Sequence, residues 1–170
     1  MKRIYVIVIV LIICIGMINS ALAKRDKQKK KQSKCIPGIV AVDVHGNFTN
    51  KGFVLQTELG TELSYWKCVQ KTSEHYFDVT IYGEDPFRIT SIVATALNYT
   101  NKSTASVVKD FLSYVATIPY DGSKPIEARQ WVFNNIDKGG SMVIGTVKFE
   151  IIVNLDSPRT RILEMSPVEL

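Results

Sequence analysis

The stretch His75–Tyr82, HYFDVTIY, has the clearest pattern of any segment in the chain. Phenylalanine, valine and isoleucine alternate in it with tyrosine, aspartate and threonine, which is the period of a strand with one buried face. The polar run 71–74 precedes it and the run 83–86 follows it, and both are typical of turns. The segment therefore predicts a half-buried strand of an antiparallel sheet.

The segments on either side of this strand are also strand-like. Residues 53–69 are rich in apolar, aromatic and threonine side chains, and an extended backbone there puts Trp66 and Cys68 on one face. Residues 87–99 are apolar enough to form a third strand. We expect the three segments to form an antiparallel meander.

The apolar period changes in the second half of the chain. Apolar residues recur at helical spacing from an N-cap at Ser103 or Thr104 until Pro119 ends the segment. A second helix is expected to begin near residues 123–125, with a proline in its first turn, and to end at residues 139–140, which are both glycine.

Two strand patterns close the chain. Residues 143–155 alternate between apolar and mostly polar side chains, and residues 160–165 form a last strand after a turn at residues 156–158. The order of strands, two helices and strands predicts an α+β fold of two layers. We expect an antiparallel sheet built from a meander and a C-terminal hairpin, with the helices on one face.

The length and composition limit what the chain can be. At 170 residues, with 46% hydrophobic and 22% charged residues, it has room for one ordinary domain and a targeting segment. These values exclude a multidomain protein, a collagen-like repeat and general disorder. We expect residues 35–170 to form a single α+β domain.

The first residues have the features of an export signal. Lys2 and Arg3 are followed by an uncharged apolar run over residues 4–18 and by the Ala-x-Ala sequence of residues 21–23. Small side chains at these last positions are what signal peptidase requires, so residues 1–23 predict a signal peptide cleaved after Ala23. The alternative is a reversed membrane anchor with a cytoplasmic body, because more basic residues follow the apolar run than precede it.

The segment 24–34 differs in charge from the rest of the chain. The formal net charge of the whole chain is +5, yet residues 35–170 hold twelve basic and fifteen acidic residues. The seven basic side chains of the segment are Lys24, Arg25, Lys27, Lys29, Lys30, Lys31 and Lys34. Because the segment has too few apolar residues to fold, we interpret it as a disordered tether to an anionic membrane or wall polymer. A solvated linker is the alternative, and nucleic acid or lipid is the partner if the body is intracellular.

The cysteines are interpreted according to the compartment. Once the leader is removed, Cys35 and Cys68 remain, and in an oxidising compartment they most simply form one disulfide. In a reducing compartment the two thiols together with His45 and His75 would be the available zinc ligands. No pair among them has the short spacing of a zinc finger, so the disulfide is the prediction and free thiols or zinc are the alternatives.

Several side chains have the chemistry of catalytic groups. Cys68, His75 and Asp78 are the residue types of a thiol hydrolase, in which a base activates the nucleophile. A carboxylate pair is the other hydrolase option, and its candidates are Glu58, Glu62, Glu84 and Asp85. Residues 140–146 have the glycine spacing of a phosphate loop but no lysine, so we predict no nucleotide cofactor.

Three features resemble small exported bacterial proteins of unestablished function. They are the segment from Asn47 to Gly52 and Phe53, then Trp66, Lys67 and Cys68, then Gly139 and Gly140 before a terminal hairpin. This resemblance implies export and supplies no catalytic residue. Together with the leader and the basic segment, it favours a small non-enzymatic binding module of the cell envelope or the exterior, without metal or other cofactor. An extracellular hydrolase using Cys68 and His75 or a carboxylate pair is one alternative, and a membrane-anchored intracellular factor is the other.

Overall fold

The structure is a computed structural model, and it describes residues 35–59, 63–100, 106–153, 157 and 159–168. The predicted leader and the predicted tether both lie outside the described residues. Within the described residues, no helix is long and apolar enough to cross a membrane.

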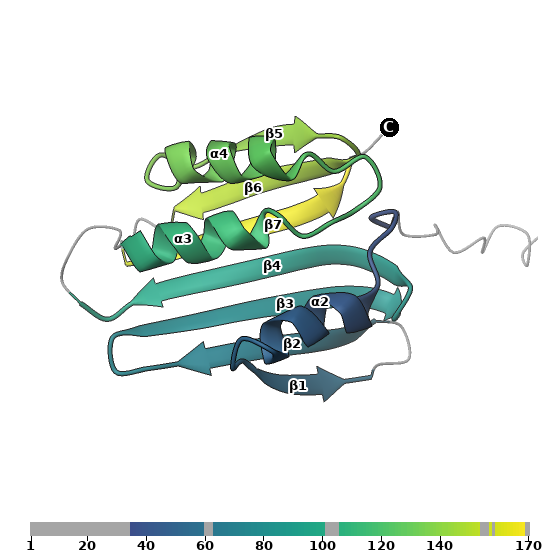
Figure 1. Ribbon diagram of the computed structural model, residues 1–170, viewed down its shortest axis with the longest axis horizontal. Helices are drawn as coiled ribbons and strands as arrows, with labels where there is room; N and C mark the ends of the chain where they lie inside the picture. The colour runs from purple at the N-terminus through teal and green to yellow at the C-terminus, as the bar shows by residue number, and fades with distance from the viewer. Residues whose placement is uncertain (1–34, 60–62, 101–105, 154–156, 158, 169–170) are drawn as a thin grey trace, which may run out of the picture. The chain divides into compact units, whose positions relative to one another are not determined.

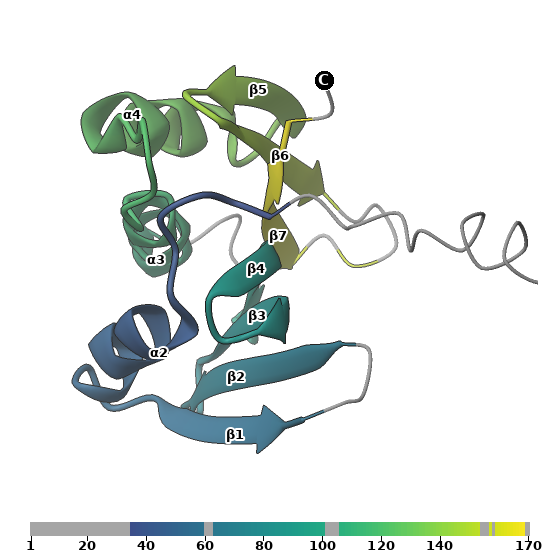
Figure 2. The ribbon, with the colours of Figure 1, turned by 90° about the vertical axis from the view of Figure 1, so that its right-hand side faces the viewer.

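Seven antiparallel strands form one sheet, and three helices lie on one of its faces (Figures 1 and 2). The elements in chain order are α2 (Ala41–Thr49), β1 (Val54–Glu58), β2 (Ser64–Lys71), β3 (His75–Asp85), β4 (Arg88–Asn98), α3 (Ser106–Val115), α4 (Pro125–Asn135), β5 (Gly140–Ile144), β6 (Val147–Val153) and β7 (Thr160–Pro167). This arrangement confirms the predicted two-layer α+β fold with its helices on one face.

The strand order in the sheet is β1-β2-β3-β4-β7-β6-β5. The first four strands form a meander, and the stretch His75–Tyr82 lies in β3 near its centre. The predicted meander had three strands, whereas residues 53–69 contribute to two strands, β1 and β2. The last strand, β7, pairs with β4 on one side and β6 on the other, so it joins the two halves of the sheet. Its helix-facing residues Leu163 and Met165 are fully buried for that reason.

The C-terminal strand pattern differs from the prediction because a tight turn interrupts it. Gly145 and Thr146 link β5 to β6, and Ile144 pairs directly with Val147. The two buried residues Ile144 and Val147 are three positions apart, so the turn shifts the alternation by one residue. Val143, which we expected on the inner face, is therefore 52% exposed on the helix-free face.

The helix α2 occupies a segment, Ala41–Thr49, for which the sequence analysis predicts no element. Its residues Ala41, Val44 and Phe48 have helical spacing and are buried against the sheet. Phe48 packs edge-on against Phe53 at a ring-centroid distance of 5.3 Å. Valine is common in this segment and favours strands, which hides the helical period.

The two predicted helices are present as α3 and α4. The described part of α3 buries Val108, Phe111, Leu112 and Val115. The second helix has Pro125 at its first position, where a missing N–H costs no helical bond. It ends at Asn135, slightly before the predicted glycines, and the predicted caps Ser103 and Thr104 lie outside the described residues.

Candidate functional site

The two faces of the sheet separate the residues of the predicted thiol hydrolase. Cys68 pairs with Val79 on the helix-covered face, where both side chains are fully buried. Asp78 precedes Val79 on the same strand, so its side chain lies on the opposite, helix-free face. A carboxylate on one face of a sheet does not orient a base for a thiol on the other.

His75 is also distant from the thiol. It lies four residues before Val79 on β3, which is roughly 13 Å along the strand. Its ring stacks on Phe77 with the two ring centroids 4.6 Å apart. This is the packing of neighbours on one face of a strand, and the strand distance leaves the nucleophile and the base beyond hydrogen-bond reach of each other.

The Cys68 thiol lies in an apolar environment beneath α2. Its Sγ is 3.9 Å from the carbonyl oxygen of His45, to which the thiol donates a weak hydrogen bond. Burial raises the pKa of this thiol to about 11, well above its usual value of 9.0. A thiol that stays protonated is a poor nucleophile, because the thiolate is the reactive form.

The predicted disulfide between Cys35 and Cys68 is wrong for this structure, in which the two cysteines are not bonded to each other. The N–H of Ile36 donates to the carbonyl oxygen of Ile89 at 2.7 Å, which places Cys35 by the β3–β4 turn. Ile89 pairs with Gly83, four residues along β3 from the partner of Cys68, or roughly 13 Å. A disulfide needs the two Cα atoms within about 7 Å, so sheet register excludes the bridge.

The zinc alternative has no assembled site in the part of the chain that the structure describes. No three His, Cys, Asp or Glu side chains come together there. His45 lies on α2 above Cys68, while His75 and Cys35 lie at different ends of β3. The fold therefore keeps His75 and Cys35 apart from each other and from the neighbouring pair His45 and Cys68.

Asp78 takes part in a polar cluster on the helix-free face. Its carboxylate is 3.7 Å from the ammonium nitrogen of Lys67 and accepts a hydrogen bond from the Thr80 hydroxyl at 3.3 Å. Asp78 itself is buried, with 6% of its surface exposed. A buried carboxylate needs such partners, so the cluster satisfies Asp78 within the sheet.

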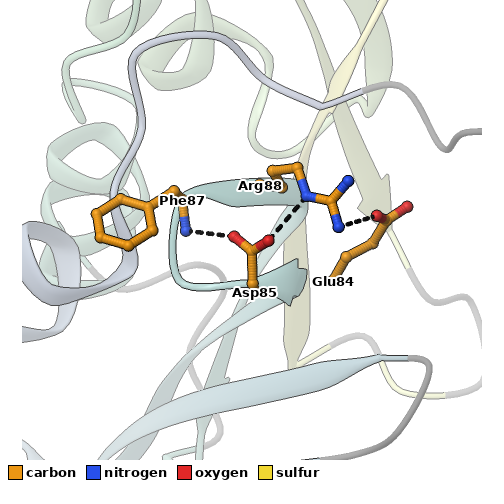
Figure 3. Close-up of polar contacts among 4 residues, drawn as sticks. All are labelled: Glu84, Asp85, Phe87 and Arg88. Carbon is orange, nitrogen blue, oxygen red and sulfur yellow. Dashed lines mark hydrogen bonds and ion pairs between the residues drawn. The ribbon is translucent and has the colours of Figure 1, made fainter.

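The carboxylates predicted as a possible catalytic pair have separate structural roles. Glu58 accepts a hydrogen bond of 2.6 Å from the Tyr65 hydroxyl at the sheet edge. Glu62 lies outside the described residues. Glu84 and Asp85 lie together at the β3–β4 turn, where both contact the guanidinium of Arg88 (Figure 3).

The β3–β4 turn is the most sharply defined polar feature of the surface. The Asp85 carboxylate accepts one hydrogen bond from the Phe87 backbone N–H at 2.9 Å and one from Arg88 Nε at 2.8 Å. A second guanidinium nitrogen is 2.7 Å from Glu84. The Arg88 side chain and the Phe87 N–H keep the pKa of Asp85 below its usual range.

This turn holds Phe87 in the solvent, where 74% of its surface is exposed. Figure 3 shows the ring pointing away from the Glu84–Asp85–Arg88 network. Aromatic side chains, phenylalanine included, are enriched at protein interfaces, so an exposed ring on a hydrogen-bonded turn is suited to contact a partner. The sequence predicts Phe87 as the first residue of a strand, whereas β4 begins at Arg88. The feature of the sequence that indicates an exposed Phe87 is its position directly after the turn residues 83–86.

The turn lies beside the point where the predicted tether meets the body. The N–H of Ala41 donates to the carbonyl oxygen of Pro86 at 2.8 Å, so the chain that leads into α2 runs along the turn. Burial raises the pKa of the Cys35 thiol, and the negative charge of Glu84 raises it further.

The environment of Cys68 predicts selective thiol labelling. We expect iodoacetamide at pH 8 to modify the partly exposed Cys35 in the folded protein and to leave Cys68 unmodified until the chain is unfolded. Mass analysis of peptides after labelling would measure this. Equal labelling rates of the two thiols, or a bridge that blocks both, would contradict the described burial.

The same thiol predicts the direction of a pH effect on stability. The unfolded thiol ionises near its usual pKa of 9.0, whereas the folded one stays protonated until about pH 11. The folded state therefore loses stability as pH rises through this interval, and Cys68→Ala should lessen the loss. Urea midpoints measured across the interval for both proteins would show the difference.

Comparisons of the chain with protein-family models, curated proteins and solved structures found no match.

Proposed function

We propose that this chain is a small exported binding protein of the cell envelope or the exterior, without catalytic activity. In this proposal a signal peptide directs export, the basic segment 24–34 attaches the protein to an anionic surface, and the folded body binds a macromolecular partner. The observation that supports it best is the rigid β3–β4 turn, which exposes Phe87 beside the start of the body.

The arrangement of the reactive side chains also supports a binding role. Cys68 is buried and protonated, and Asp78 is on the other face of the sheet. Glu84 and Asp85 share one guanidinium, and its hydrogen bond lowers the pKa of Asp85, which makes Asp85 a poor general acid. A network of this kind positions a turn for recognition.

The charge of the chain supports attachment through the tether. Seven basic residues fall within 24–34, while the body carries more acidic than basic residues. An anionic surface would therefore attract the segment and repel the body weakly, which favours attachment at one end. Each basic side chain close to an anionic membrane contributes about 1 kcal/mol.

Removal of the basic segment is expected to abolish attachment. The exported chain should bind vesicles of phosphatidylcholine with phosphatidylglycerol, and its affinity should fall more than about a hundredfold when residues 24–34 are deleted. Replacement of the seven basic residues by glutamine keeps the length and should have the same effect. Vesicle sedimentation at increasing salt would measure both, and salt-independent retention of the deletion variant would contradict the tether.

The turn is expected to contact the partner directly. We would place the photocrosslinking amino acid benzoylphenylalanine at Phe87 and irradiate the protein on intact producing cells. A discrete crosslinked product is expected at this position, because an exposed aromatic ring on a rigid turn is suited to a central contact. The matched control is Val54, which is 65% exposed at the sheet edge formed by β1. Equal products at both positions, or none at Phe87, would refute the role of the turn.

A further inference from the structure

A small cavity lies between α2 and α3, which cover the same face of the sheet (Figure 2). Its volume is about 220 Å³. The residues on its wall include Ile39, Asp43, Val44, Phe48, Tyr114 and Ile118. The Tyr114 hydroxyl on α3 donates to the side-chain oxygen of Asn47 on α2 at 2.7 Å and joins the two helices at this wall. The cavity therefore has mostly apolar walls with a few polar groups at fixed positions, as sites for small molecules do.

The charges around this cavity favour a cation. Asp43 is the one charged residue among the described residues that line it. Within the described part of the chain, its carboxylate forms no ion pair. A second carboxylate, that of Asp121, lies against Gly38 on the wall. The opposing charge is the Lys51 ammonium, which is 4.8 Å from the Tyr114 ring centroid. Two carboxylates and one ammonium leave a net negative potential at the cavity.

Two aromatic rings form part of the wall. Phe48 and Tyr114 meet nearly at right angles, with an interplanar angle of 79° and ring centroids 5.8 Å apart. The faces of such rings attract cations, and quaternary ammonium ions are bound in this way. A primary ammonium brings three N–H donors that each need an acceptor. A quaternary ammonium has none and presents methyl groups, which suit apolar wall residues such as Val44 and Ile118.

We propose that this cavity binds a small quaternary ammonium compound of the size of choline. Its trimethylammonium group lies against Phe48 and Tyr114 with Asp43 as the counter-ion, and its hydroxyl end reaches the Asn47 amide. The Asp43 carboxylate thereby gains the charge partner that it lacks within the described residues. The cavity belongs to the folded body, so the inference does not depend on export or on the basic segment.

Titration of choline into the isotope-labelled protein, purified after expression of the full-length chain, tests the proposal by NMR. Saturable shifts of backbone resonances are expected within residues 38–48 and 114–119, where the lining residues lie. Two matched compounds separate charge from shape. The dimethylbutanol in which carbon replaces the choline nitrogen keeps the shape without the charge, and ethanolamine keeps the charge without the methyl groups. Both should bind at least about tenfold more weakly than choline.

Variants of the wall test the two interactions separately. Asp43→Asn should weaken choline binding at least about tenfold, because it removes the counter-ion with little change of shape. The matched control Asp110→Asn removes an exposed carboxylate of α3 away from the cavity wall and should leave the affinity unchanged. Tyr114→Leu should weaken binding about fivefold, whereas Tyr114→Phe keeps the ring and should bind within about twofold of the original protein. Thermal unfolding establishes that each variant is folded.

Equal affinities for choline and the dimethylbutanol would show that the cavity recognises shape alone, and the proposal would fail. Ethanolamine binding as tight as that of choline would exclude the quaternary ammonium class. Equal effects of Asp43→Asn and Asp110→Asn would exclude Asp43 as the counter-ion. The absence of saturable shifts below about 50 mM choline, or shifts confined to residues outside the cavity, would overturn binding at this place.

Discussion

Replacement of Gly145 by alanine is expected to destabilise the fold by about 3 kcal/mol or more. Gly145 has a backbone φ of +61°, a conformation that side chains with a Cβ rarely adopt. An added Cβ would lie 2.2 Å from the Gly122 carbonyl oxygen, which belongs to the turn before α4. Because the close atom is backbone, the two turns would have to separate. Urea unfolding followed by circular dichroism would measure the loss.

Gly46 is the matched control for this substitution. It lies within α2, and an added Cβ there would have nothing within 4 Å. Alanine has a higher helix propensity than glycine, so Gly46→Ala should be neutral or stabilise by about 0.5–1 kcal/mol. A Gly145→Ala variant as stable as Gly46→Ala would show that the contact between the two turns is not as described.

Loss of Arg161 is the second large effect that we expect. This residue lies on the helix-facing side of β7, and its side chain is 10% exposed. Its Nε donates to the carbonyl oxygen of Ile136 at 2.9 Å, just beyond the end of α4, and a terminal nitrogen is 3.6 Å from Asp137. Arg161→Ala should cost about 3 kcal/mol, because it removes a buried charged donor and leaves a helix-end carbonyl unsatisfied.

The control for this variant is Arg129→Ala. Arg129 is exposed on α4, so its removal should change the unfolding free energy by less than about 0.5 kcal/mol. Thermal or urea unfolding of both variants would measure the difference. A small effect of Arg161→Ala would show that water replaces its contacts, contrary to the burial described.

The strands of the meander were predictable because each has a simple physical signal. In β4 the buried residues alternate with partly exposed ones, and in β3 apolar residues alternate with polar ones although residues 77–81 are all buried, so the period of two is visible in the sequence. The two helices in the second half were predictable for a similar reason, since Pro125 and the helical spacing of Val108, Phe111 and Leu112 are local features. Local patterns of this kind need no knowledge of the fold.

The features that escaped prediction depend on contacts distant in sequence. The Gly145 turn shifts the alternation between β5 and β6, and its backbone is held by contact with Gly122. The distance between Cys35 and Cys68 follows from strand register. The number of cysteines in the sequence carries no information about that register. The exposure of Phe87 depends on the side chains of Asp85 and Arg88, which hold the turn.

The candidate site was predictable only in part. The sequence indicates Glu84 and Asp85 as acidic turn residues that could form a catalytic pair. In the structure both contact Arg88, and this contact supports the turn. The sequence contains the residue types of a thiol hydrolase in Cys68, His75 and Asp78, whereas strand geometry puts Cys68 and Asp78 on opposite faces. The chain therefore has the residue types of a thiol hydrolase, but the fold does not bring them within hydrogen-bond reach of one another.

The most direct test of the account is the intact mass and location of the protein made by producing cells. We predict that it is recovered from the medium or the outer surface, that it begins at Lys24, and that protease added to intact cells degrades it. A chain that retains Met1 or the apolar run, with a body protected from that protease, would contradict export. In that case the surface attachment and the extracellular partner proposed above would both be wrong.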